Sequence, residues 1–307
     1  MAAEALSVLA LLLAAYTLTA ALSLQLNFYQ NSCPRAEAIV QQVVQQHFQQ
    51  NSSVPAGLLR LHFHDCFIRG CDGSVLIDST DDSIAEKEAP PNLTLRTFDV
   101  IDDIKAELEK ECPGVVSCAD ALALAARDGV ALAGGDFYDL PTGRRDGTGS
   151  NMGDVHIPSP LFSVEQALSA FQSINLDLED LTTLLGAHSM GFCHCGFFID
   201  RLYDFRGTVF MNQFSTTFHF SNSFYHNMLN EKALLQLDRD LAFTDYMSTL
   251  ASQYANDPVL FRNRFSESMI KLGSAGVLTG RDGEIRTNCR RVNNATSISS
   301  GAKLSAP

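Results

Sequence analysis

Residues 58–78 read LLRLHFHDCFIRGCDGSVLID, and the first half of this stretch has the pattern of a helix. No glycine or proline interrupts residues 58–69, and leucine, isoleucine and phenylalanine side chains supply apolar contacts. Arg60 and His64 are four residues apart, so a helix places them on one face, about one turn from each other. A neutral imidazole can take a proton from a bound acid, and a neighbouring guanidinium can stabilise the anion left behind.

The second half of the stretch is a tight loop, bracketed by Cys66 and Cys71, that is rich in oxygen ligands. Asp65, Asp72 and Ser74 offer hard oxygens near backbone carbonyls, and a calcium ion prefers such ligands. The alternative is ordinary turn chemistry, because aspartate, glycine and serine are common turn residues.

Two other interpretations of these residues stay open. A histidine on an apolar helix is more often a hydrogen-bonded core residue than a catalyst. A zinc site could use His62, His64, Cys66 and Cys71, but His62 and His64 alternate along the chain and cannot both face one ion from a helix. An arginine, histidines, cysteines and aspartates so close together are less easily explained by packing alone.

Residues 60–67 and 70–74 together resemble the distal-haem segment of the secretory plant (class III) haem peroxidases. The resemblance implies a mainly α fold in which haem b lies between a distal part, up to about residue 160, and a proximal part. It implies reduction of hydrogen peroxide, a role in the response to oxidative stress, and oxidation of small phenolic donors by one-electron steps. Arg60 and His64 become the pair that stabilises charge and moves the peroxide proton, and Phe63 shields the distal side of the haem.

The resemblance assigns further roles on the distal side. Asn92 accepts the outer N–H of His64, which keeps the inner nitrogen free to act as a base. The alternative for Asn92 is a glycosylated surface turn, since Asn92-Leu93-Thr94 is a formal sequon. Pro158 lies at the rim of the substrate channel, and the alternative is a simple helix-start proline. The implied distal calcium ligands are Asp65, Ile68, Gly70, Asp72 and Ser74.

Residues 185–191, LGAHSMG, match the proximal-haem motif of the family. His188 is the implied axial ligand of the iron, and Asp238 accepts its other ring N–H, which gives the imidazole imidazolate character. A rival hypothesis takes the same stretch as the nucleophile elbow of a serine hydrolase, with Ser189 as nucleophile. That elbow requires a preceding strand, whereas residues 178–188 have a helical pattern.

The family pattern is interrupted after residue 205. A helical insertion of the family is missing, and residues 206–220 are all that stand in its place. This internal deletion on the proximal side removes the expected disulfide partner of Cys195, and we expect Cys193 and Cys195 to be free thiols or intermolecular. It suggests an alternative function, a haem- and calcium-binding relative with impaired catalysis.

The deletion also bears on a proximal calcium site. Ser189 and Thr216 remain as implied ligands, but Gln213 and Ser221 replace the expected carboxylates. Neutral oxygens in place of anions should weaken calcium binding strongly.

The chain has 307 residues and a formal net charge of −13, so it has no electrostatic footprint for nucleic acid. An apolar run followed by small residues predicts a signal peptide over residues 1–24, with a transmembrane anchor as the alternative. The haem peroxidase domain then spans residues 25–295, and residues 296–307 form a flexible tail. We expect a monomer with no membrane span in the mature protein, exported to the cell wall, with the vacuole as the alternative destination.

Eight cysteines in an exported chain predict disulfides. Spacing alone leaves the pairing open, and the resemblance implies Cys33–Cys112, Cys66–Cys71 and Cys118–Cys289. The sequons at Asn51 and Asn294 suit glycosylation of an exported protein.

Hydrophobic periodicity predicts helices over residues 37–50, 98–112, 118–132, 163–174 and 178–188. Residues 86–92 should form a loop, because two prolines exclude a regular helix. Arg144 and Arg145 are by default a solvated basic patch, while the resemblance makes their stretch a structural turn. Tyr138 stands where the family usually has a tryptophan, so we expect a modest packing change.

Overall fold

The computed structural model describes residues 23–193 and 218–293, and this part of the chain is mainly α-helical. Alongside its α-helices and short 3-10 turns, the described part has isolated β-bridges and no named strand. The mainly α fold is therefore confirmed. The signal peptide, apart from its last two residues, and the C-terminal tail lie outside the described residues, and the proposed domain boundaries stay predictions.

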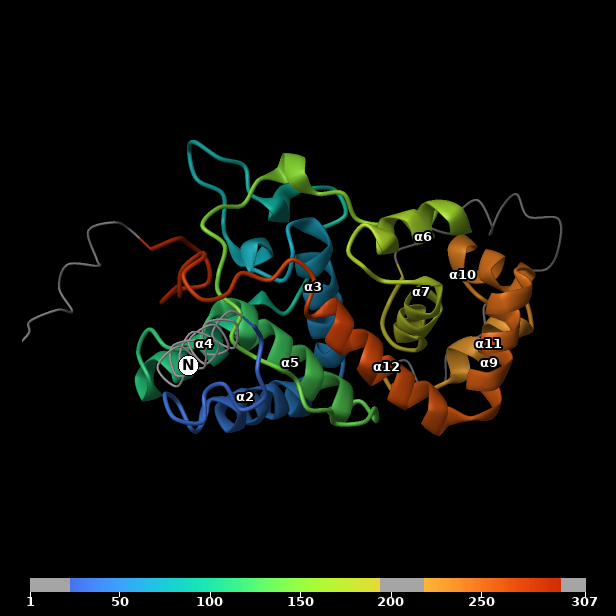
Figure 1. The fold of residues 1–307 in the computed structure, drawn as a ribbon, viewed down its shortest axis with the longest axis horizontal. Helices are drawn as coiled ribbons and strands as arrows, with labels where there is room; N and C mark the ends of the chain where they lie inside the picture. Colours follow the sequence, from blue (N-terminus) through green and yellow to red (C-terminus); the bar gives the residue numbers. More distant parts are fainter. Residues whose placement is uncertain (1–22, 194–217, 294–307) are drawn as a thin grey trace, which may run out of the picture.

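Four α-helices build the described part of the N-terminal half (Figure 1). They are α2 (Ala36–Gln50), α3 (Val54–Ile68), α4 (Phe98–Glu111) and α5 (Cys118–Leu132). Helix α5 packs against the other three, because its alanine- and leucine-rich sequence is apolar on nearly every face. The Ser117 hydroxyl caps its start by accepting from the Asp120 N–H.

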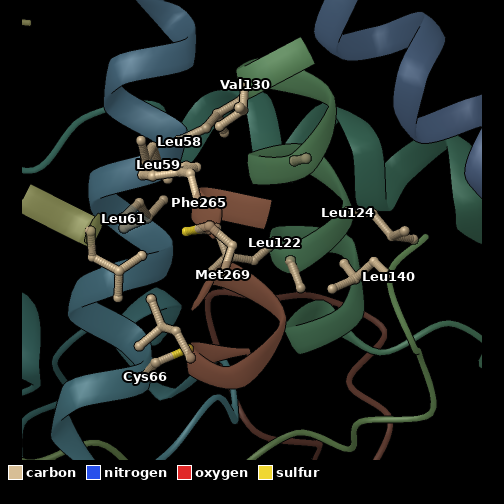
Figure 2. Close-up of a cluster of buried hydrophobic side chains, with 14 of the residues drawn as sticks. Leu58, Leu59, Leu61, Cys66, Leu122, Leu124, Val130, Leu140, Phe265 and Met269 are labelled. Atoms are coloured by element: carbon tan, nitrogen blue, oxygen red, sulfur yellow. The ribbon is translucent and has the colours of Figure 1, made fainter. Parts of the chain in front are cut away.

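The core of this half forms where α3 and α5 meet α12 (Pro258–Leu272). Figure 2 shows leucines of α3 and α5 beside Phe265 and Met269 of α12. Leu58 and Leu122 are fully buried. Burying one such side chain contributes about 1.5–3 kcal/mol, so this layer fixes α3 and the side chains that it presents on its other face.

The C-terminal half holds α6 (Val164–Gln172), α7 (Leu178–Leu184), α9 (Ser223–Leu229), α10 (Gln236–Asp240) and α11 (Asp245–Asn256), which lie together at one end of the molecule in Figure 1. Helix α7 packs on α12 and α11, and α9 packs on α11. Through α12, whose C-terminal end reaches the N-terminal core, the two halves share one framework.

The prediction of one helix over residues 178–188 is wrong at its C-terminal end. Helix α7 ends at Leu184, and a 3-10 turn, Leu185–Ser189, follows. Gly186 lies in this turn, where a Cβ atom would stand 2.6 Å from both the Tyr225 hydroxyl and Phe261 Cε2. The close approach of α9 and α12 requires glycine here, and glycine weakens a regular helix.

Three disulfides tie the described segments together: Cys33–Cys112, Cys66–Cys71 and Cys118–Cys289. This is the pairing that the family resemblance implied. Cys193 is half-buried and belongs to none of the three, and Cys195 lies outside the described residues.

The default interpretation of a solvated basic patch is wrong for Arg144, which is buried. Its guanidinium pairs with Asp120 at 2.7 Å, and both side chains are fully buried. The Asp120 carboxylate also accepts from the Gly143 N–H at 2.7 Å and the Tyr29 hydroxyl at 2.7 Å. A charge removed from water needs such partners, so the stretch is the structural turn that the resemblance implied.

Tyr138, which we expect to stand in the place of a family tryptophan, is buried. In the part of the chain that the structure describes, no helix combines the length and apolar character needed to cross a membrane.

Candidate active site

Helix α3 places the proposed base, His64, in a buried position with its outer nitrogen occupied. His64 is 5% exposed, and its Nδ1 lies 2.7 Å from the Asn92 side-chain oxygen. The Asn92 amide donates in turn to the Glu86 backbone carbonyl at 2.8 Å, which orients it. An amide oxygen can only accept, so Nδ1 carries the proton and Nε2 keeps its lone pair.

Asn92 is 2% exposed and lies in a turn after the 3-10 segment Glu86–Glu88. A buried hydrogen bond to His64 leaves no room for a glycan. The structure therefore contradicts the alternative of a glycosylated surface turn at Asn92.

Arg60 lies one turn before His64 and is held by several acceptors. Its Nε donates to His64 Nε2 at 3.2 Å, Nη1 to the Thr94 hydroxyl at 2.8 Å and Nη2 to the Pro91 carbonyl at 3.1 Å. Burial and the Arg60 charge lower the pKa of His64 to about 3, against the opposing hydrogen bond to Asn92. His64 is therefore a neutral imidazole at ordinary pH, as a base must be.

Phe63 is anchored by two aromatic neighbours. Its ring centroid lies 4.4 Å from Phe67 and 6.3 Å from Phe171 of α6. Pro158 is half-buried in the segment that leads into α6. The same helix that follows the predicted rim residue thus restrains the Phe63 ring.

His188 is the centre of a second hydrogen-bonded pair. Its Nδ1 lies 3.0 and 3.1 Å from the two carboxylate oxygens of Asp238 on α10. The imidazole is 42% exposed while Asp238 is 5% exposed. Partial removal of the ring from water would by itself lower the pKa of His188, but the charge of Asp238 and the hydrogen bond to it raise the pKa above its ordinary value.

His188 suits the role of an axial ligand. Its Nδ1 is held by a carboxylate, which is the usual outer partner of a metal-binding histidine, and its ring is accessible in this structure. Gly191, three residues after His188, lies against Ala56 of α3, where a Cβ on Gly191 would stand 3.5 Å from the Ala56 Cβ. Ala56 is one turn before Arg60 on the same helix, so the two centres lie near each other. The donor set therefore fits a haem iron.

The serine hydrolase hypothesis fails on its structural requirement. Ser189 follows helix α7 and ends a 3-10 turn, where a nucleophile elbow requires a strand. Its side chain is 3% exposed, and its hydroxyl accepts from the Ser221 N–H at 3.3 Å.

Four buried oxygen-bearing side chains gather beside α3: Asp65, Asp72, Ser74 and Glu86. Asp65 accepts from the Gly73 N–H at 3.0 Å, and the Ser74 hydroxyl donates to Glu86 at 3.2 Å. Burial and the charge of Asp72 raise the pKa of Asp65 well above its usual range, and burial raises that of Glu86 to about 7.

One oxygen of this group, Glu86 Oε1, is buried with no hydrogen-bond partner. Three buried carboxylates that disfavour one another's charge fit a hard divalent cation. Gly70 closes the turn that leaves α3 with φ of +103°, where a Cβ would lie 2.3 Å from the Gly276 carbonyl oxygen.

The zinc interpretation is wrong for the described structure. Ligand atoms of His62, Cys66 and Cys71 lie within 4.8 Å of one another, but both sulfurs belong to one disulfide and offer no thiolate. Burial and Arg144 lower the pKa of His62 to about 3, so His62 is a neutral core histidine. Of the proximal calcium residues, Thr216 and Gln213 lie outside the described part.

Three residues near the site were not foreseen: Thr94, Arg96 and Phe171. Thr94 follows Asn92 closely in the same loop, so its position was a usable signal. Phe171 was predicted only as part of a helix, since its contact with Phe63 depends on how α6 packs.

Two histidine centres near each other on a mainly helical scaffold are the arrangement expected of a haem peroxidase. Comparison with known proteins agrees: a family model described as "Peroxidase" matches residues 40–257. The chain is 45% identical to Peroxidase 57 of Arabidopsis thaliana over 294 residues, which cover 88% of this chain and 93% of the relative. It is 41% identical to Peroxidase 28 of the same plant over 316 residues, covering 94% and 98%.

A grape relative extends the match. Peroxidase 5 of Vitis vinifera is 42% identical over 302 residues, covering 88% of this chain and 92% of the relative. The chain belongs to the class III plant peroxidases, haem oxidoreductases that bind haem b and calcium and use hydrogen peroxide. Homologues in this class are typically secreted. The internal deletion falls mostly outside the described residues and stays a prediction.

Proposed function

We propose that this chain is a secreted peroxidase that reduces hydrogen peroxide at His64 and Arg60 and oxidises small phenolic donors. One observation carries the proposal: His64 Nε2 is a neutral base beside the Arg60 guanidinium, because Asn92 occupies Nδ1 at 2.7 Å. The pair His188–Asp238 supplies the iron ligand on the other side.

His64 and Arg60 have different roles in the proposed reaction. When haem b is bound against His188, its iron supplies the redox chemistry. His64 Nε2 takes the proton of the peroxide and returns it to the leaving oxygen, and the Arg60 guanidinium stabilises the charge that develops. Arg60 Nε–H occupies the Nε2 lone pair in this structure, so the peroxide O–H must displace that donor.

The distal calcium ion would be held by Asp65, Ile68, Gly70, Asp72 and Ser74. The buried carboxylates and the orphaned Glu86 oxygen support this assignment, because an ion would offset their repulsion. Ser189 and Thr216 are the residues left for a proximal calcium ion, and we expect that site to be weak.

Donor access and export complete the proposal. Small phenolic donors would approach by Pro158, with Phe63 restricting what reaches the iron. Three disulfides suit an oxidising compartment, so we assign the protein to the cell wall, with the vacuole as the alternative, as a monomeric glycoprotein with Asn51 as an exposed sequon.

The test is reconstitution with haemin and calcium, followed by visible absorption and by guaiacol oxidation with hydrogen peroxide. His188→Ala should lose haemin uptake. His64→Leu should keep haemin but slow turnover by about 10²–10⁴-fold. His156→Leu, at an exposed histidine, is the matched control. Equal turnover in His64→Leu and wild type would refute the assignment, and haemin uptake without turnover in wild type would support the impaired relative.

A further inference from the structure

Arg60 and Arg96 form a pair of cations that have no carboxylate partner among the described residues. Within the described part of the chain, Arg60 donates hydrogen bonds to His64, Thr94 and the Pro91 carbonyl and makes no ion pair. Arg96 is exposed and makes no ion pair within the described part of the chain. Burial and the charge of Arg96 both lower the pKa of Arg60, and Cys193 opposes them.

Arg96 lies over an exposed aromatic ring that belongs to the segment after His188. Its guanidinium carbon is 5.4 Å from the ring centroid of Phe192, which is 66% exposed. Phe218 packs against the same ring at 5.0 Å, edge to face. We call this contact the Arg96–Phe192 clasp.

The clasp joins the two centres of the active site. Arg96 lies just beyond Thr94, which holds Arg60, and Phe192 lies just beyond the turn that carries His188. Asp99 lines the same 280 Å³ cavity as Arg96 but is not within ion-pair distance of it. An exposed ring beside a guanidinium that pairs with no described carboxylate suits a ligand that has both a flat apolar body and a negative charge.

We propose that the Arg96–Phe192 clasp binds the carboxylate of a flat aromatic ligand at the edge of the active site. The inference rests on the proposed function, and the carboxylate has two sources: a propionate of the bound haem, or the acid group of a phenolic acid donor. With a net charge of −13 the chain repels anions at long range, so these two cations give such a donor a local point of attraction.

Two titrations separate the sources, each with wild type, Arg96→Gln and the matched control Arg281→Gln, which removes an exposed arginine outside the site. The first follows haemin and haemin dimethyl ester uptake by the haem-free protein through visible absorption. The second follows binding of 4-hydroxycinnamate and of the neutral 4-hydroxycinnamyl alcohol to the haemin-loaded protein by difference absorption.

The clasp predicts that Arg96→Gln weakens a carboxylate probe about fivefold and leaves its neutral partner unchanged. A loss for haemin alone identifies the propionate, and a loss for 4-hydroxycinnamate alone identifies a donor subsite. Arg96→Lys should restore part of the affinity, and the loss should shrink at high salt. In the case of a donor subsite, Phe192→Leu should weaken the binding of 4-hydroxycinnamate and of 4-hydroxycinnamyl alcohol to a similar extent.

The inference and the proposed function fail in different ways. If wild type takes up no haemin, the proposed function falls and the clasp with it. If wild type takes up haemin and Arg96→Gln behaves as Arg281→Gln in both titrations, only the clasp is overturned.

Discussion

Among the described residues, two histidines place Nδ1 against a side-chain oxygen, and the partner differs between them. At His64 the partner is the amide of Asn92, at 2.7 Å, and at His188 it is the carboxylate of Asp238, at 3.0 Å. Burial and the Arg60 charge lower the pKa of His64 to about 3, whereas Asp238 raises that of His188 above its ordinary value. Asn92→Asp should therefore give His64 a carboxylate partner at Nδ1, as His188 has, and raise the pKa of His64.

A carboxylate partner opposes the two effects that lower the pKa of His64. A carboxylate at Asn92 should move the pKa of His64 from about 3 to its ordinary value of about 6.5, which is roughly 4 to 5 kcal/mol in favour of the imidazolium. The protonated form has no lone pair on Nε2. At pH 5 only about 3% of His64 would then remain as base, while wild type would stay almost wholly neutral.

Stopped-flow measurement of the peroxide reaction between pH 4 and 8 tests this. The acid limb of the Asn92→Asp profile should rise to near pH 6.5, with about a thirtyfold slower reaction at pH 5. Asn256→Asp, which adds the same charge at an exposed position, should behave as wild type. If the acid limb of Asn92→Asp coincides with that of wild type, the reasoning about the Nδ1 partner is wrong.

Three further substitutions test the scaffold. Asp65→Asn should lower calcium content and melting temperature, because it removes a buried anion from the proposed site; unchanged metal analysis would contradict this. Gly186→Ala should cost about 1–3 kcal/mol in urea unfolding, since its Cβ would stand 2.6 Å from Phe261 Cε2, and a neutral result would mean that α12 yields easily. Asp120→Ala should cost about 3–5 kcal/mol by leaving the Arg144 charge buried and unpaired, which the same unfolding experiment measures.

Local sequence patterns predicted most helices because those helices carry their own signals. The helix predicted over residues 118–132 has those bounds in the structure, with a serine cap and an apolar surface all round. The end of α7 could not be predicted in this way. Its change to a 3-10 turn depends on Gly186 meeting α9 and α12, and no local pattern reports contacts with segments so far along the chain.

The contacts of the candidate site likewise fall into local ones, which the sequence predicts, and distant ones, which it does not. Arg60 and His64 share one helix, so their spacing alone placed them together. The contact between Asn92 and His64 crosses a loop, and only the family resemblance proposed it. Neither helix spacing nor the family resemblance predicted the contact of Thr94 with Arg60, because it depends on the exact path of that loop.

The base and the proposed calcium loop are parts of one hydrogen-bonded chain. Ser74 in the loop donates to the Glu86 carboxylate at 3.2 Å, the Glu86 carbonyl accepts from Asn92 at 2.8 Å, and Asn92 meets His64 Nδ1 at 2.7 Å. Burial favours the uncharged form of every titratable group here. This suits His64, which must be neutral, but it disfavours the ionised form of the buried carboxylates nearby. A cation in the loop would relieve that opposition without adding charge next to the imidazole. The protein can therefore hold a neutral base and an anionic metal site close together. The Glu86 residue connects them, because its side chain faces the loop and its backbone carbonyl orients Asn92.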